Sequence, residues 1–134
     1  MGAQIRVDVD RKIIIEGVEK LHGARHRTII DRIEAASYAA LALATDGNII
    51  IRNAQQQHMI TFLNALQKVG GGFKVTDEGI AFFRARDELS PIHIETDVHP
   101  GFMTDWQQPF VVMLTQAKGV SIIHETVYEN RFGY

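Results

Sequence analysis

The stretch "DRIEAASYAALALATDGNIIIRN", from Asp31 to Asn53, decides the fold because it joins a helix signal directly to a strand signal. Asp31 precedes Glu34 by three residues, the spacing of a capping box, and Gly47 follows the last helical position. The run between them is rich in Ala and Leu and apolar nearly all round, which predicts a buried helix. The apolar run at 48–53 then predicts a short, fully buried strand.

The residues around this stretch complete a repeating unit. Residues 54–72 have the spacing of an amphipathic helix, and the glycine run at 70–72 stops it. Residues 73–85 predict a hairpin that turns at "DEG", and residues 26–30 predict a strand ahead of the first helix. The predicted order is therefore βαβαββ, over residues 28–88. The apolar face of the second helix consists of Met59, Phe62, Leu63, Leu66 and Val69.

The same pattern returns 72 residues later in the chain. Residues 91–96 and 120–128 predict strands, residues 104–119 predict the helix between them, and residues 129–134 predict the opening of another helix. We therefore expect a second copy of the unit, over residues 89–134, truncated after roughly its third element. The matching pairs are Gly47 and Gly119, Ile50 and Ile122, Ile51 and Ile123, and Leu41 and Met113.

The N-terminal residues form a separate predicted segment. Residues 5–10 alternate apolar and polar side chains, and residues 12–16 continue as a second strand after a turn at Asp10-Arg11. Gly17 and Gly23 punctuate the polar connection that follows. Residues 1–27 therefore predict a hairpin followed by a linker between larger units.

Composition excludes several classes of protein. The 134 residues are 46% hydrophobic with a formal net charge of -2, and charges of both signs are interspersed, so we expect no nucleic-acid or anionic-membrane partner. The absence of cysteine excludes a disulfide framework and a cysteine nucleophile within this chain. No apolar run approaches the ~20 residues of a membrane helix, and the N-terminus lacks a signal-peptide core. We predict a cytoplasmic protein.

Asp105, in "HPGFMTDWQQPF", has two interpretations. Thr104 is a good N-cap, and an acid in the first turn of a helix interacts favourably with the positive end of the helix dipole. Alternatively, the carboxylate lies beside a Pro-Gly loop at a helix N-terminus, placed to accept a proton or a hydrogen bond from a sugar hydroxyl.

Two arginines pose a similar choice. Asp31 and Arg32 suit a capped helix with a solvated arginine, but an arginine at a helix start can also hold an anion. Arg131, in "ENRF", is by itself an ordinary surface arginine. Among the six histidines only His22 and His26 have helical i, i+4 spacing, and Gly23 lies between them, so we predict no metal site and no cofactor.

Four segments in unbroken order resemble the UDP-N-acetylglucosamine 1-carboxyvinyltransferase family of enolpyruvyl transferases. They are "IIIEGVEKLHGARHRTIIDRIEAASY", "IIIRNAQ", "HPGFMTDWQQPF" and "HETVYENRF", which together run from about Ile13 to Phe132. The related shikimate-pathway transferase shares the fold, but its members are not expected to carry these motifs. The resemblance implies an α+β fold of βαβαββ repeats, the α/β prism, with the active site between two domains. It also implies that residues 1–27 are the terminal hairpin and the interdomain linker of the preceding domain.

The resemblance also implies a reaction and its residues. The family transfers an enolpyruvyl group from phosphoenolpyruvate to the 3-hydroxyl of UDP-N-acetylglucosamine and releases phosphate, opening peptidoglycan precursor synthesis for the cell wall. Asp105 matches the general-base candidate that contacts the acceptor sugar, and Thr104 lies beside it. Val127 matches a contact to the nucleotide sugar, and Arg131 matches an arginine that lines the cleft. Asp31 and Arg32 match the interdomain junction near the uridine.

Departures from the family pattern keep two alternatives open. Ile30 stands where the family usually has proline, and Trp106 and Pro109 depart from its common "DMQAQF", so a divergent paralogue is one alternative. The other is a non-catalytic binding or assembly module, in which self-association would cover the open sheet edge. The leading hypothesis is a fragment of the transferase that lacks the phosphoenolpyruvate wall and is inactive alone.

Overall fold

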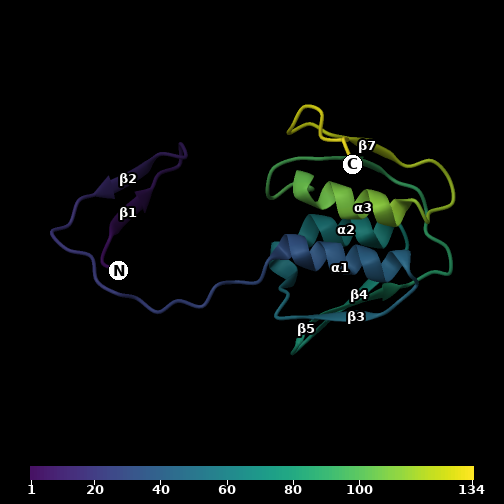
Figure 1. Ribbon diagram of the computed structural model, residues 1–134, viewed down its shortest axis with the longest axis horizontal. Coiled ribbons are helices and arrows are strands. Elements are labelled where there is room, and N and C mark those ends of the chain that lie inside the picture. The colour runs from purple at the N-terminus through teal and green to yellow at the C-terminus, as the bar shows by residue number, and fades with distance from the viewer.

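A computed structural model describes all residues, 1–134, and shows a small hairpin apart from a helical and sheet-containing body (Figure 1). Strands β1 (Gln4–Val7) and β2 (Ile13–Glu16) pair antiparallel, as predicted, with Ile5 opposite Ile15. The connection that follows has no regular structure up to Asp31. The strand predicted at residues 26–30 is therefore wrong, because this segment is largely exposed and no neighbouring strand pairs with it.

Helix α1 (Arg32–Ala44) is held at both ends by side chains. The carboxylate of Asp31 accepts hydrogen bonds from the backbone amides of Ile33 (2.7 Å) and Glu34 (3.3 Å), so Asp31 is the predicted N-cap. At the other end, the Arg84 guanidinium donates to the carbonyls of Leu43 (2.5 Å) and Ala44 (3.2 Å), two of the groups that a helix C-terminus leaves unpaired. Small side chains on this helix let neighbouring elements approach closely. Its buried residues are Ala35, Ala36, Ala39, Ala40, Ala42 and Leu43.

A three-stranded antiparallel sheet follows, in the order β3-β5-β4. Strand β3 (Ile49–Arg52) lies at the edge and alternates half-buried with exposed residues, so the prediction of a fully buried strand is wrong. Strands β4 (Gly71–Thr76) and β5 (Gly79–Arg84) form the predicted hairpin. Gly71 lies inside β4 because a Cβ there would be 2.5 Å from Leu43 Cδ2, too close for any side chain.

Helix α2 (Ile60–Lys68) follows a short 3₁₀ turn, η1 (Gln56–His58), and buries the predicted apolar face. All five residues of that face are at most 2% exposed. Burial of this stripe, at roughly 25 cal/mol for each Å² of apolar surface removed from water, anchors the helix to the sheet.

The second unit contains strand β6 (His93–Glu95), a 3₁₀ turn η2 (Thr104–Trp106), helix α3 (Gln107–Leu114) and strand β7 (Ile122–His124). Strands β6 and β7 pair in parallel, so this unit is a βαβ crossover. Residues 129–134 form turns, not the helix that the sequence predicts. The reason is local: Asn130 has a left-handed backbone, with φ 56°, which interrupts a right-handed helix.

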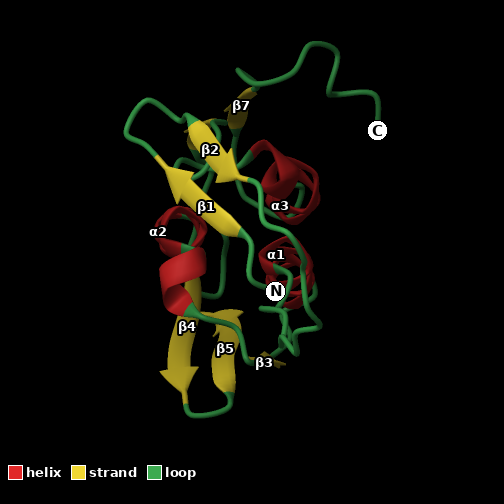
Figure 2. Cartoon of the chain, turned by 90° about the vertical axis from the view of Figure 1, so that its left-hand side faces the viewer, coloured by secondary structure: helices red, strands yellow, loops and turns green.

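The three helices lie between the β3-β5-β4 sheet and the β6-β7 pair, in both views (Figures 1 and 2). One core joins the two units, and an aromatic cluster with ring centroids 5.2–6.4 Å apart lies at its centre. This mixture of helices and strands confirms the predicted α+β class. No helix is long and apolar enough to cross a bilayer. The cluster consists of Phe62, Phe102, Trp106 and Phe110.

Candidate active site at the start of α3

Asp105 lies in η2, one turn before α3, between two buried neighbours. Thr104 is 6% and Trp106 1% exposed, whereas the Asp105 side chain is 42% exposed. The buried neighbours fix the backbone, and the carboxylate remains accessible to a molecule from solution. An anionic group at this end of a helix also interacts favourably with the backbone dipoles.

Thr104 does not cap the helix, contrary to the sequence prediction. No side chain caps η2 or α3, and the Thr104 hydroxyl instead donates to Glu125 Oε2 at 2.8 Å. The prediction failed because η2 begins at Thr104 itself, with Met103 at the N-cap position, so the Thr104 hydroxyl is not placed to accept from the amides of the turn. Thr104 therefore connects the start of α3 to the segment after β7.

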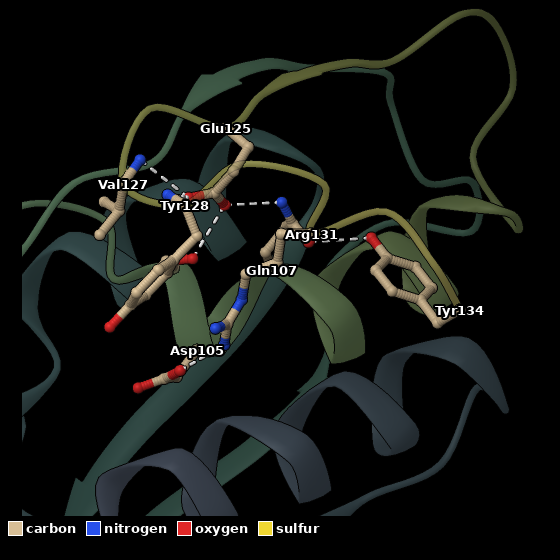
Figure 3. A network of polar contacts seen from close by, with 8 residues as sticks. Asp105, Gln107, Glu125, Val127, Tyr128, Arg131 and Tyr134 are labelled. Carbon is tan, nitrogen blue, oxygen red and sulfur yellow. Dashed lines mark hydrogen bonds and ion pairs between the residues drawn. The ribbon is translucent and has the colours of Figure 1, made fainter.

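Arg131 and Asp105, both predicted site residues, are in contact. Arg131 Nη2 donates to Asp105 Oδ1 at 2.5 Å, and the guanidinium lies 4.9 Å from the centre of the Tyr128 ring. Arg131 Nε is buried with no hydrogen-bond partner. The arginine is thus held on one side by a carboxylate and on another by an aromatic face, a cation–π arrangement. Figure 3 shows Arg131 directed toward Asp105.

Glu125 is the centre of this network, and the sequence prediction missed it. Oε2 accepts from Thr104 Oγ1 (2.8 Å) and Gln107 Nε2 (2.7 Å), and Oε1 accepts from the backbone amides of Val127 (2.9 Å) and Tyr128 (3.1 Å) (Figure 3). Desolvation acts to raise the pKa of Glu125, but the hydrogen bonds from Thr104, Val127 and Tyr128 outweigh it and leave that pKa below its usual value. Each oxygen of the Glu125 carboxylate therefore accepts two hydrogen bonds from neighbouring donors.

No spacing rule could have found Glu125. Its side-chain partners are 18 and 21 residues away, beyond the reach of helix and turn patterns. The one available signal is a carboxylate placed directly after an apolar strand, "SIIHE".

Gln107 and Tyr134 extend the network. Gln107 is 1% exposed, and its Oε1 accepts from the Tyr134 hydroxyl at 3.0 Å. Burial and the nearby negative charge of Glu125 raise the pKa of Tyr134, so its hydroxyl remains a proton donor at neutral pH.

The loop at 125–132 borders an open pocket of about 570 Å³. Val127 is half-buried in this loop, and its amide is already used by Glu125. Of the polar groups that border the pocket, the Arg131 guanidinium is the one that also contacts Asp105. The pocket is therefore open and polar, and its arginine connects it to the Asp105 carboxylate.

Asp31 and Arg32 lie outside this network. The Asp31 carboxylate caps α1, and Arg32 Nη1 lies 3.1 Å from His99 Nδ1 in the loop before η2. No hydrogen bond or ion pair joins either residue to Asp105, Glu125 or Arg131. Nor does the chain contain a group of three or more side chains that could hold a metal ion.

Comparison with known proteins places this arrangement in context. The whole chain, residues 1–134, matches the family described as EPSP synthase (3-phosphoshikimate 1-carboxyvinyltransferase). It is 56% identical over 134 residues to the UDP-N-acetylglucosamine 1-carboxyvinyltransferase of Protochlamydia amoebophila (strain UWE25), covering 100% of this chain and 29% of that protein. It is 51% identical over 133 residues to the protein of the same name from Chlamydia pneumoniae, covering 99% of this chain and 29% of that one.

Among solved structures, the enolpyruvyl transferase NikO from Streptomyces tendae matches with a TM-score of 0.76 and 22% identity. That match covers 98% of this chain and 32% of NikO, and at this identity it establishes the fold alone. The chain thus spans about three-tenths of the length of the curated relatives it matches.

Proposed function

Because the chain belongs to the EPSP synthase (3-phosphoshikimate 1-carboxyvinyltransferase) family, we propose that it forms part of an enolpyruvyl transferase and carries the wall of the active site that binds UDP-N-acetylglucosamine. The names of the relatives that share 51–56% of its residues support this acceptor. The observation that carries the proposal is the accessible Asp105 carboxylate, held beside Arg131 at the start of a helix.

Asp105 is the general base in this proposal. When the 3-hydroxyl oxygen of the sugar bonds to the enolpyruvyl carbon of phosphoenolpyruvate, the hydroxyl must lose its proton, and phosphate leaves from the same carbon. Arg131 occupies one oxygen of Asp105, and the other oxygen is left to accept that proton. A positioned base of this kind contributes roughly 10²–10⁴-fold in rate.

The other predicted residues bind the acceptor. Val127 borders the pocket and gives the sugar an apolar surface, while Thr104 fixes the backbone next to Asp105. Arg131 balances the negative charge of the nucleotide, because a guanidinium fork matches phosphate oxygens. We assign Asp31 and Arg32, at the start of α1, to the uridine end of the ligand.

The groups that hold phosphoenolpyruvate come from parts of the enzyme outside residues 1–134, so we propose that this chain is inactive alone. Both walls of a cleft must assemble before reacting groups are oriented. With both substrates present, release of inorganic phosphate by the isolated chain should equal the uncatalysed rate. Measurable turnover would contradict this. In the complete enzyme we place the reaction in the cytoplasm, in peptidoglycan precursor synthesis.

A titration of the ¹⁵N-labelled chain with UDP-N-acetylglucosamine tests the binding wall. We expect saturable shifts of the Val127 amide and of the Arg131 side-chain signal, and in Arg131→Gln the Val127 shift should report weaker binding. Titration with 3-phosphoshikimate is the matched control for the other acceptor named by the family, and it should leave these signals unchanged. Shifts with 3-phosphoshikimate alone would reassign the acceptor.

A further inference from the structure

The buried polar side chains of this molecule are concentrated at one place. Only three polar residues are buried, Thr96, Thr104 and Gln107, and none is more than 6% exposed. Thr104 and Gln107 both donate to Glu125. Thr96 bonds instead to Thr126, accepting from its backbone amide at 3.0 Å through the side chain and from its hydroxyl through the carbonyl at 2.5 Å. Burying a polar group is unfavourable unless it finds a hydrogen-bond partner. All three buried residues find theirs in the segment that begins at Glu125, and their hydrogen bonds hold this segment in place.

Glu125 connects two parts of the chain through its two oxygens. Oε2 accepts from Thr104 and Gln107, on either side of Asp105 and Trp106 at the start of α3. Oε1 accepts from the amides at the beginning of the 125–132 loop. The same loop carries Arg131, whose guanidinium returns to Asp105. Glu125 therefore closes a ring of contacts around the reactive carboxylate without touching it.

We propose that Glu125 is a positioning residue that sets the geometry of the Asp105–Arg131 pair for the bound sugar nucleotide. The proposal deepens the function given above and rests on it for the identity of the ligand. The positioning itself, however, is a property of the ligand-free protein: Glu125 holds Arg131 in place although the two side chains do not contact each other.

A carboxylate is required at this position because four donors converge on it. Each carboxylate oxygen can accept two hydrogen bonds, and Glu125 uses that capacity with no donor of its own. A glutamine of the same shape would direct an NH₂ group at one pair of donors, either the side chains of α3 or the loop amides. One of the two connections would therefore be lost even though the volume is unchanged.

The decisive comparison is Glu125→Gln against Glu129→Gln. Glu129 is exposed in the same loop, so its substitution removes an equal charge from the same segment. The readout is the rate at which the Arg131 Nε–H exchanges with solvent in the ligand-free chain, because Arg131 Nε is buried. We expect E125Q to accelerate this exchange by about tenfold, the scale expected when buried donors lose an acceptor. E129Q should leave it unchanged.

Hydrogen exchange of backbone amides in the core distinguishes a local effect of E125Q from a global loss of stability. If E125Q acts locally, the backbone amides of Leu43 and Leu66 exchange at the wild-type rate while Arg131 and the loop exchange faster. Equal acceleration throughout the chain, or an unchanged Arg131 rate in a folded variant, would overturn the proposal. If E125Q does not fold, Thr104→Val removes one donor at constant volume and should give a smaller acceleration in the same direction, with Thr104→Ser as its rescue.

Ligand binding separates this proposal from the proposed function. If the wild-type chain binds UDP-N-acetylglucosamine, E125Q should weaken binding, whereas Glu78→Gln, which removes an equal charge in the distant β4–β5 turn, should not. If the wild-type chain does not bind it, the proposed acceptor fails, whereas the Arg131 exchange rate still decides the role of Glu125.

Discussion

The starts of helices α1 and α3 occupy equivalent places in the two units, and their acidic residues have different tasks. Asp31 directs its carboxylate to the amides of its own helix. The position 72 residues later is Met103, which provides no side-chain cap, and Asp105 lies two residues further on with its carboxylate on Arg131. One carboxylate caps its own helix, and the other pairs with an arginine of a distant loop and stays partly exposed.

The difference lies in how the first turn is held. At α3 no side chain caps the backbone amides, and Glu125 instead accepts from the side chains of Thr104 and Gln107 in this turn. This arrangement leaves Asp105 accessible while its backbone stays fixed by the burial of Thr104 and Trp106. If the proposed function is right, the repeated fold holds a structural acid and a chemical acid at nearly the same position.

The largest expected effect separates these two acids by activity. In a complete transferase that contains this segment, Asp105→Asn should lower kcat by roughly 10²–10⁴-fold, because the amide cannot accept the hydroxyl proton. The KM for the sugar nucleotide should change much less. Steady-state kinetics measures both, with Asp77→Asn in the distant β4–β5 turn as a control. An unchanged kcat would reduce Asp105 to a structural residue.

The next effect concerns stability and should appear at the other acid. Asp31→Ala removes the acceptor for two amides at the start of α1 and should cost about 1 kcal/mol of unfolding free energy. Asp31→Asn keeps a capping oxygen and is the matched control, expected near the wild-type value. Urea unfolding followed by circular dichroism measures both variants. If D31A and D31N are equally stable, the cap does not contribute to folding.

The acid dependence of stability tests the contribution of Glu125. Since Glu125 has a lowered pKa in the folded chain, its charged form favours folding, and this contribution is complete above the unfolded pKa of roughly 4.3. It is lost as the pH falls through the folded pKa, because protonation then removes an acceptor. Unfolding free energies measured from pH 6 downward should show this decline, and E125Q should remove part of it. An identical pH profile in E125Q would contradict the assignment.

Local signals predicted most of the fold, and the exact backbone conformation accounts for two of the failures. The Asp31 cap, the apolar face of α2 and the hairpin of β4 and β5 follow from spacing along the chain, and the structure contains all three. The helix expected at residues 129–134 is interrupted by the left-handed backbone of Asn130, and the cap expected at Thr104 is absent because the turn begins at that residue.

The candidate site divides in the same way. Family resemblance singled out Asp105 and Arg131, and the structure brings these two side chains together. The ligand-binding roles assigned to Asp31, Arg32, Thr104 and Val127 stay predictions. Spacing along the sequence does not reveal the role of Glu125, because that role depends on four donors that only the folded chain brings to one point.

The smallest expected effect on stability distinguishes Arg32 from Asp31, its neighbour in the chain. The Arg32 guanidinium has one contact, to the exposed His99, and Arg32 is only half-buried, so Arg32→Gln should change the unfolding free energy by less than about 0.5 kcal/mol. If Arg32 lies at the uridine end of the ligand, the same variant should nevertheless weaken binding of UDP-N-acetylglucosamine, measured by the titration described above. Arg25→Gln, in the exposed connection, is the matched control for loss of one positive charge. Equal loss of affinity in both variants would indicate a general effect of charge, whereas loss confined to R32Q would place the ligand at the start of α1, where Asp31 already caps the helix.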